Sequence, residues 1–209
     1  MSNPLIPILK DCWVKIEKIY NDGKICSERH LQAEIFSILS HDDRFKNIFQ
    51  VFVEPRIFSK DDKVINFGII GIKPDMIITQ KDRIVCVYEL KYVPYFHHGH
   101  PEYQKDIINL SKFYELKGSN EVIFYLETNP KTGDWNYERR FTIDDGLLIA
   151  YSAIAKKDSD AFTLAEEIFE GKRTDSKPIE NYIYLKGIIN KDNYPNFDID
   201  PKRDLHLMI

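Results

Sequence analysis

The chain has 209 residues, 43% of them hydrophobic and 13% aromatic, which is enough for one substantial core, so we expect a single domain over residues 1–209. The formal net charge of −4 excludes a protein that coats nucleic acid through bulk positive charge, but mild acidity is compatible with carboxylates that hold a divalent cation. The three cysteines have no zinc-site or disulfide spacing, and no apolar run reaches the ~20 residues of a membrane span or forms a secretory signal, so we expect a cytoplasmic protein outside membranes.

Two helices and a run of strands are predicted for the first half of the chain. Apolar residues at helical spacing predict a helix over 4–20, and a second helix begins after Ser27, a good N-cap, and ends near His41. The pattern then changes to strands over 49–58, 64–70, 73–79 and 83–92. The last two of these strands are close enough in sequence to form a hairpin.

The second half of the chain is predicted to be mainly helical. Helical spacing recurs over 103–116, 143–156 and 161–169, with a buried strand over 122–127 and an extended segment over 182–185. No repeat or linker divides the chain. The order of elements predicts an α/β (mixed α+β) fold, with a central mixed sheet flanked by helices.

Two charged residues stand at the end of an apolar strand pattern. Side chains alternate along 83–92, so Glu89 and Lys91 share one face with Val85 and Val87. Charges in such a position are costly unless they have partners or a metal, which is a reason to suspect a functional site. Cleavage of a phosphodiester needs a nucleophilic water and neutralised charge, and divalent metals held by carboxylates can supply both.

Asp75 reaches the face of Glu89 only if the turn between the two strands has the right length. With a three-residue turn at 80–82, Asp75 pairs with Val87 and lies diagonal to Glu89, roughly 7–8 Å away at Cα. A two-residue turn at Lys81-Asp82 would reverse the parity and send the two acids to opposite faces. A metal site therefore predicts the odd turn.

These residues resemble the motif of the PD-(D/E)XK, or restriction-endonuclease-like, superfamily. The motif here is Pro74-Asp75, thirteen intervening residues, and Glu89-Leu90-Lys91. The element order over about 27–127 also resembles that family's core, in which an acid-bearing helix precedes a three-stranded meander, a helix and another strand. The resemblance implies a metal-dependent nuclease with a restriction-endonuclease-like core.

The resemblance also implies roles for the motif residues. Asp75 and Glu89 would ligate Mg²⁺ or Mn²⁺, with the backbone carbonyl of Leu90 as a third protein ligand, and Lys91 would lie beside the attacking water. Two nearby carboxylates favour the charged ammonium, so we expect Lys91 to position groups and stabilise charge rather than act as a free base.

Two helices are expected to contribute further residues. The family places a catalytic, metal-ligating acid on the helix before the meander, and Glu28 fits that role better than Glu34 because it lies in line with that helix's apolar stripe. The family often has a Gln on the helix after the motif strand. Gln104 stands in that region as a substrate-side candidate, with Asp106 nearby.

Each motif residue also has a structural explanation of its own. Asp75 fits a turn, Glu89 and Lys91 fit an ion pair on an edge strand, and Glu28 is favourable at any helix N-terminus. Their joint occurrence is what favours a site.

The sequence leaves more than one function open. We favour a nuclease acting on nucleic acid, with DNA preferred to RNA, and the resemblance also allows a homodimer. The alternative is a catalytically silent module of the same fold that binds nucleic acid or protein. A third, weaker hypothesis is a hydrolase that uses His97, His98 and His100 as a metal site, although a solvated loop explains that run better.

Overall fold

The computed structural model describes residues 3–59, 73–94, 101–118, 121–128, 135–157, 159–172, 178–189 and 195–199. The helices are α1 (Leu5–Asn21), α2 (Glu28–His41), α3 (Asp43–Lys46), α4 (Pro101–Glu115) and α5 (Asp160–Phe169). The strands are β1 (Gln50–Val53), β2 (Arg56–Ser59), β3 (Met76–Gln80), β4 (Arg83–Val93), β5 (Glu121–Thr128), β6 (Trp135–Lys156), β7 (Tyr182–Ile189) and β8 (Pro195–Ile199).

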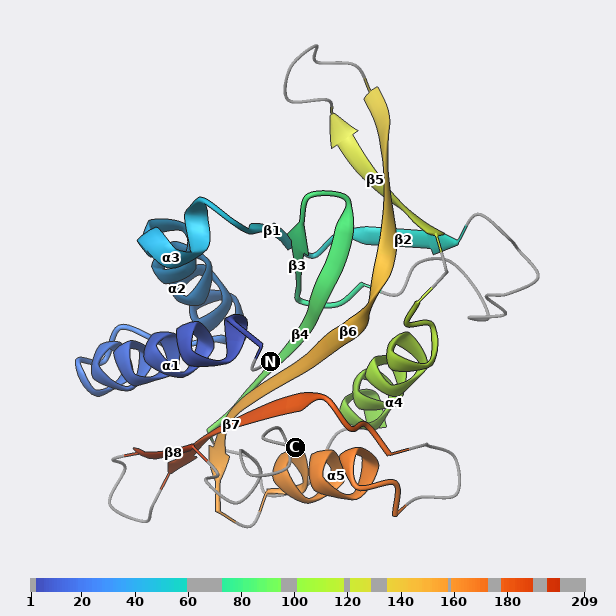
Figure 1. The fold of residues 1–209 in the computed structure, drawn as a ribbon. Helices are drawn as coiled ribbons and strands as arrows, with labels where there is room; N and C mark the ends of the chain where they lie inside the picture. The colour runs from blue at the N-terminus through green and yellow to red at the C-terminus, as the bar shows by residue number, and fades with distance from the viewer. Residues whose placement is uncertain are drawn as a thin grey trace.

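One mixed, eight-stranded sheet organises these elements, with helices on its two faces (Figure 1). Six strands lie in the order β1-β3-β4-β6-β5-β2, and β7 pairs with β6 and with β8. The strands β1, β3 and β4 form an antiparallel meander, whereas β4 and β6 are parallel. The strand β6 has 22 residues and pairs with β5 along its first part and with β7 along its last part.

The two faces of the sheet carry separate apolar clusters. Helices α1, α2 and α3 cover one face and pack on Met76, Cys86 and Leu90, whereas α4 and α5 cover the other and pack on Ile77 and Val87. Figure 1 shows the two groups of helices on opposite sides of β4 and β6. Because side chains alternate along a strand, every second residue of β4 points toward α4 and α5.

Most predicted elements are confirmed. Ser27 caps α2 through a hydrogen bond from the His30 N–H at 3.2 Å, and the helices expected over 4–20, 103–116 and 161–169 correspond to α1, α4 and α5. The strand expected over 49–58 is two strands, β1 and β2, which separate at Glu54, a residue with a positive φ of 46°. The strand expected over 64–70 lies outside the described residues.

The helix predicted over 143–156 is wrong, because this segment belongs to β6. Leu148, Ala150 and Ile154 are buried on the α1–α3 side, whereas Ile149 and Tyr151 are buried on the α4–α5 side. A central strand that is apolar on both faces lacks the alternation that distinguishes a strand from a helix. The parallel neighbour of the motif strand is therefore β6, which extends the sheet around the site beyond the predicted core of 27–127.

The turn between β3 and β4 also differs from the prediction. Gln80 pairs with Arg83, so the turn is the two-residue Lys81-Asp82, and Lys81 has a positive φ of 56°. The three-residue turn at 80–82 is wrong. A two-residue turn continued in regular pairing would have placed Asp75 and Glu89 on opposite faces.

A β-bulge at Val85 restores the parity. The paired residues change from Thr79 with Ile84 to Ile78 with Cys86, which leaves Val85 as the extra residue. Val85 packs on the α1–α3 side beside Cys86, and not on the face where alternation alone had placed it. From the bulge onward, β4 has the side-chain parity that a metal site requires.

Candidate functional site

The candidate site lies where β4 continues past the start of β3. The ladder between the two strands ends at the pair of Met76 with Tyr88, whereas β4 runs on to Val93. No described strand pairs with this edge of β4 beyond Tyr88. We call this segment of backbone the open edge of β4.

Carboxylates occupy the open edge in place of a neighbouring strand. The Leu90 N–H donates to Asp75 Oδ2 at 2.6 Å, and the Tyr92 N–H donates to Glu28 Oε2 at 3.1 Å. In a strand, the N–H and the C=O of one residue point to the same edge. The Leu90 carbonyl therefore lies on the edge where Asp75 sits, as its predicted role as a ligand requires.

Asp75 and Glu89 meet on one face of the sheet. The pairs Ile77 with Val87 and Met76 with Tyr88, continued by one residue, bring Asp75 opposite Glu89 rather than opposite Val87. The two acids interact electrostatically, because the Asp75 carboxylate raises the pKa of Glu89. Two acids on one face of a strand pair disfavour each other's charged form, and a proton or a nearby cation relieves that repulsion.

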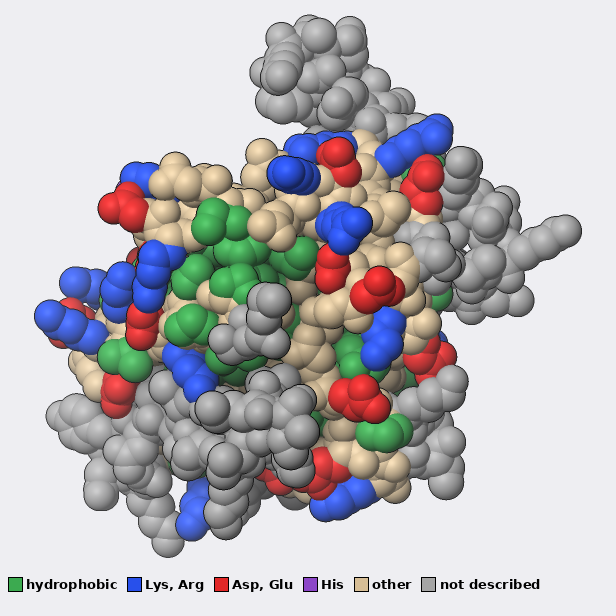
Figure 2. Space-filling model, in the orientation of Figure 1, with side chains coloured by type: hydrophobic (Ala, Val, Ile, Leu, Met, Phe, Trp, Pro, Cys, Tyr) green, Lys and Arg blue, Asp and Glu red, His purple; other side chains and the backbone are tan. Residues whose placement is uncertain are grey.

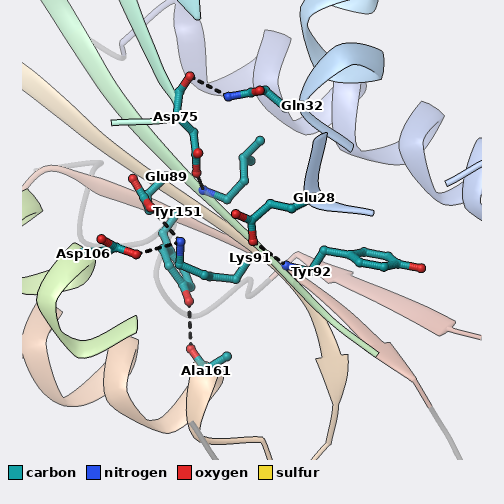
Figure 3. A network of polar contacts seen from close by, with 10 residues as sticks. Glu28, Gln32, Asp75, Glu89, Lys91, Tyr92, Asp106, Tyr151 and Ala161 are labelled. Carbon is teal, nitrogen blue, oxygen red and sulfur yellow. Dashed lines mark hydrogen bonds and ion pairs between the residues drawn. The ribbon is translucent and has the colours of Figure 1, made fainter. Parts of the chain in front are cut away.

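Lys91 lies beside this pair of acids (Figure 3). Its Nζ donates to Glu89 Oε1 at 2.7 Å and lies 3.0 Å from Asp106 Oδ2, which comes from α4. Lys91 is 3% exposed and Glu89 is 6% exposed, so both charges are withdrawn from water. Burying charged side chains to this extent costs folding free energy unless the charges are paired.

Burial and mutual repulsion change the ionisation of the site. Burial raises the pKa of Glu89 well above its usual range, and the Asp75 carboxylate adds to that effect while Lys91 opposes it. Burial also raises the pKa values of Asp75 and Glu28, in each case against the opposing charge of Lys91. For Lys91, burial lowers the pKa, but Glu89, Glu28, Asp106 and Asp75 outweigh it and raise the pKa above the usual value, so Lys91 remains an ammonium group.

Helix α2 supplies two side chains to the site. Of the two candidate acids on this helix, Glu28 is the one whose carboxylate reaches the motif strand, as predicted in preference to Glu34. Gln32 was missed by the sequence analysis, although it follows Glu28 by one helical turn on the same face. Its Nε2 donates to the backbone carbonyl of Asp75 at 2.8 Å.

Two further residues come from α4 and β6. Asp106, which was predicted only as a neighbour of Gln104, forms an ion pair with Lys91. The sequence did carry a signal for it, because Asp106 lies four residues before the buried Leu110 and so on the side of α4 that faces the sheet. Tyr151 is the parallel partner of Glu89 on β6, and its hydroxyl donates to the buried carbonyl of Ala161 at 3.1 Å. No sequence signal identified it, because its segment was predicted to be helical.

Two predicted features lie outside the description. Gln104 lies in α4, but its side chain is not among those described. His97, His98 and His100 lie outside the described residues altogether. Their predicted roles stay predictions.

The oxygen donors of the site fit a hard divalent cation such as Mg²⁺ or Mn²⁺. In the described part of the chain, no group of three or more His, Cys, Asp or Glu side chains is arranged to hold a metal ion. Mg²⁺ commonly takes only one or two protein carboxylates and keeps several of its waters. Asp75 and Glu89 match that number of carboxylates, with Glu89 buried and Asp75 half-buried on the same face of the sheet.

The surface around the described residues is electrically mixed. On the face drawn in Figure 2, Lys and Arg side chains are interspersed with Asp and Glu side chains. A groove of about 700 Å³ opens at the hairpin turn, at the far end of β4 from the site, and both signs of charge line it: Lys81, Arg83 and Arg140 with Asp82 and Glu121. The groove is therefore separate from the carboxylate cluster and offers phosphate little net attraction.

Comparison with known proteins gives no relative. No protein-family model, no curated protein and no solved structure matches this chain. Among the helices described, none is long and apolar enough to cross a membrane.

Proposed function

We propose that this chain is a metal-dependent nuclease with a restriction-endonuclease-like core, which uses Mg²⁺ or Mn²⁺ to hydrolyse phosphodiester bonds of nucleic acid, with DNA preferred to RNA. The observation that carries the proposal is the meeting of Asp75, Glu89 and Lys91 at the open edge of β4. A buried cluster with more acids than bases costs stability, and such clusters gather at functional sites.

The order of elements supports the proposed core. Helix α2 carries the acid Glu28 and precedes the antiparallel strands β1, β3 and β4, with the motif on the last two. Helix α4 follows, and β6 then lies parallel to the motif strand. This succession resembles that of the family's core, except that the strand expected over 122–127 is β5, which pairs with β2 and β6, and β6 takes the place beside the motif strand.

The site residues divide the chemistry between them. Asp75, Glu89 and the Leu90 carbonyl would hold the cation, which when bound lowers the pKa of water and neutralises charge on the phosphate. Lys91, fixed between Glu89 and Asp106, is the group available to stabilise negative charge that develops on the phosphoryl oxygens. Glu28 holds the backbone of the motif strand and adds to the negative charge that attracts a cation.

A cleavage assay tests the proposal directly. Linear, circular and single-stranded DNA and RNA are incubated with the protein and Mg²⁺, Mn²⁺ or EDTA. We expect metal-dependent cleavage that falls by about a hundredfold or more in Asp75→Asn and Lys91→Met, the scale for loss of one charge-stabilising group. Asp144→Asn is the matched acidic control, because Asp144 pairs with Arg83 near the hairpin turn, and it should cleave normally.

Two results would overturn the proposal. Unchanged cleavage in both site variants would assign the activity to another site or to a contaminant. Absence of cleavage on every substrate by the folded protein would favour the silent module, which would then be sought by DNA binding in the presence of EDTA.

A further inference from the structure

The backbone carbonyl of Asp75 is held by two donors from outside the β3–β4 ladder. The Gln32 amide donates to it at 2.8 Å, and the Glu54 N–H donates to it at 2.9 Å. Asp75 precedes β3, and the paired residues of the β3–β4 ladder end at Met76, so bonds to other elements add to what fixes its orientation. The direction of its carboxyl group depends on these two bonds and on its own bond to the Leu90 N–H.

Gln32 is one of the few polar residues that the described structure buries. It is 7% exposed, and a buried amide is costly unless it makes hydrogen bonds. Its Nε2 donates a hydrogen bond to the Asp75 carbonyl. Glu28, one helical turn earlier on α2, accepts a hydrogen bond from the Tyr92 N–H. Helix α2 therefore bonds to two segments at the open edge. Gln32 bonds to Asp75, just before β3, and Glu28 bonds to Tyr92 of β4.

We infer that Gln32 is a positioning residue, which fixes the Asp75 backbone so that its carboxyl group meets Glu89 and the Leu90 N–H. The inference rests on the proposed function for its consequence, because Asp75 is a metal ligand only in that proposal. Hydrogen-bond partners of metal ligands typically change metal affinity or activity by about 10- to 100-fold when they are removed. Gln32 should act on this scale without touching the cation.

The backbone amides of β4 give a readout that needs no metal. Gln32→Met keeps the unbranched shape and removes the donor, and Gln32→Glu keeps the length and polarity but replaces the donor by an acceptor. In both variants we expect the Leu90 amide to change its NMR shift and to exchange its hydrogen about tenfold faster or more, as its acceptor Asp75 becomes less ordered. The Tyr92 amide, which is bonded to Glu28, should stay unchanged.

Mn²⁺ titration of the same variants gives the second readout. We expect Gln32→Met and Gln32→Glu to bind Mn²⁺ about 10- to 100-fold more weakly than wild type. Gln80→Met is the matched control, because Gln80 is an exposed residue of β3 at the hairpin turn and should alter neither readout.

The outcomes separate the inference from the proposed function. An unchanged Leu90 amide in a folded Gln32 variant would overturn the positioning role. Equal changes at Leu90 and Tyr92 together with a lower unfolding free energy would also overturn it, because they indicate packing alone. If wild type binds no Mn²⁺, the proposed metal site fails, whereas the response of the Leu90 amide still decides the role of Gln32.

Discussion

Replacing Lys91 with methionine removes the ammonium group that lies 2.7 Å from Glu89 and 3.0 Å from Asp106. Glu89 is buried, so its carboxylate would be left without that counter-charge and away from water. Removing one partner of a buried ion pair costs about 3–5 kcal/mol when the other partner stays charged. We expect Lys91→Met to lose that amount of unfolding free energy at about pH 8.

The loss should shrink as the pH falls. Burial raises the pKa of Glu89, and Lys91 opposes that rise, so its removal moves the pKa higher still. Between the usual carboxyl pKa and the raised value, the folded state binds the proton that the unfolded state has released, so stability falls with rising pH by about 1.4 kcal/mol per unit and per proton. Lys91 stays charged below its ordinary pKa of 10.5, so its own titration adds no pH dependence in this range, and its stabilising effect follows the charge of Glu89. The wild-type and variant curves should therefore converge toward about pH 5.

Urea unfolding at several pH values measures this difference, with the fluorescence of the buried Trp13 as a probe. Lys186→Met is the matched control, because Lys186 on β7 pairs with Glu166 outside the site. That control should lose less stability, with little dependence on pH over the same range. Equal losses for Lys91→Met at both ends of the range would refute the account of Glu89, as would a variant as stable as wild type at about pH 8.

Three further predictions concern the metal, Tyr151 and the bulge. Mg²⁺ or Mn²⁺ at about 100 times its dissociation constant should raise the unfolding free energy by about 2.7 kcal/mol, measured as a higher thermal unfolding midpoint that EDTA reverses. If Asp75→Asn showed the same increase in midpoint, Asp75 would not be a ligand. Tyr151→Phe removes the hydroxyl that donates to the Ala161 carbonyl and should cost about 0.5–1.5 kcal/mol in urea unfolding; full stability would contradict that contact. Deletion of Val85 should remove the bulge but keep Mn²⁺ binding, because Thr79 with Ile84 and Ile78 with Cys86 then become consecutive pairs and Asp75 stays opposite Glu89; loss of binding in a variant that is still folded by circular dichroism would contradict this register.

Local signals were sufficient to predict α2 and the residues of the motif. Ser27 as an N-cap and the helical spacing after it placed Glu28 at the start of α2, on the side that faces the sheet. Alternation along β4 placed Glu89 and Lys91 on one face, because that segment keeps regular strand geometry. These features depend on residues that are near one another in sequence.

The remaining features depend on contacts between distant segments. The bulge at Val85 faces an irregular stretch of β6, since Ile84 pairs with Ile143 and Cys86 with Leu148. The register of β4 therefore depends on a strand about 60 residues away, a separation at which local patterns carry little information. The same strand is apolar on both faces because it lies between β4 and β7, which explains why its sequence resembled a helix.

The open edge of β4 also bears on how the chain avoids association. An exposed strand edge presents N–H groups that can pair with a strand of another molecule. At Leu90 and Tyr92 the carboxylates of Asp75 and Glu28 already accept those hydrogens, so the acidic residues of the site also block strand addition. Alanine at either acid would leave an edge donor free to recruit a second copy, whereas asparagine or glutamine keeps an acceptor there.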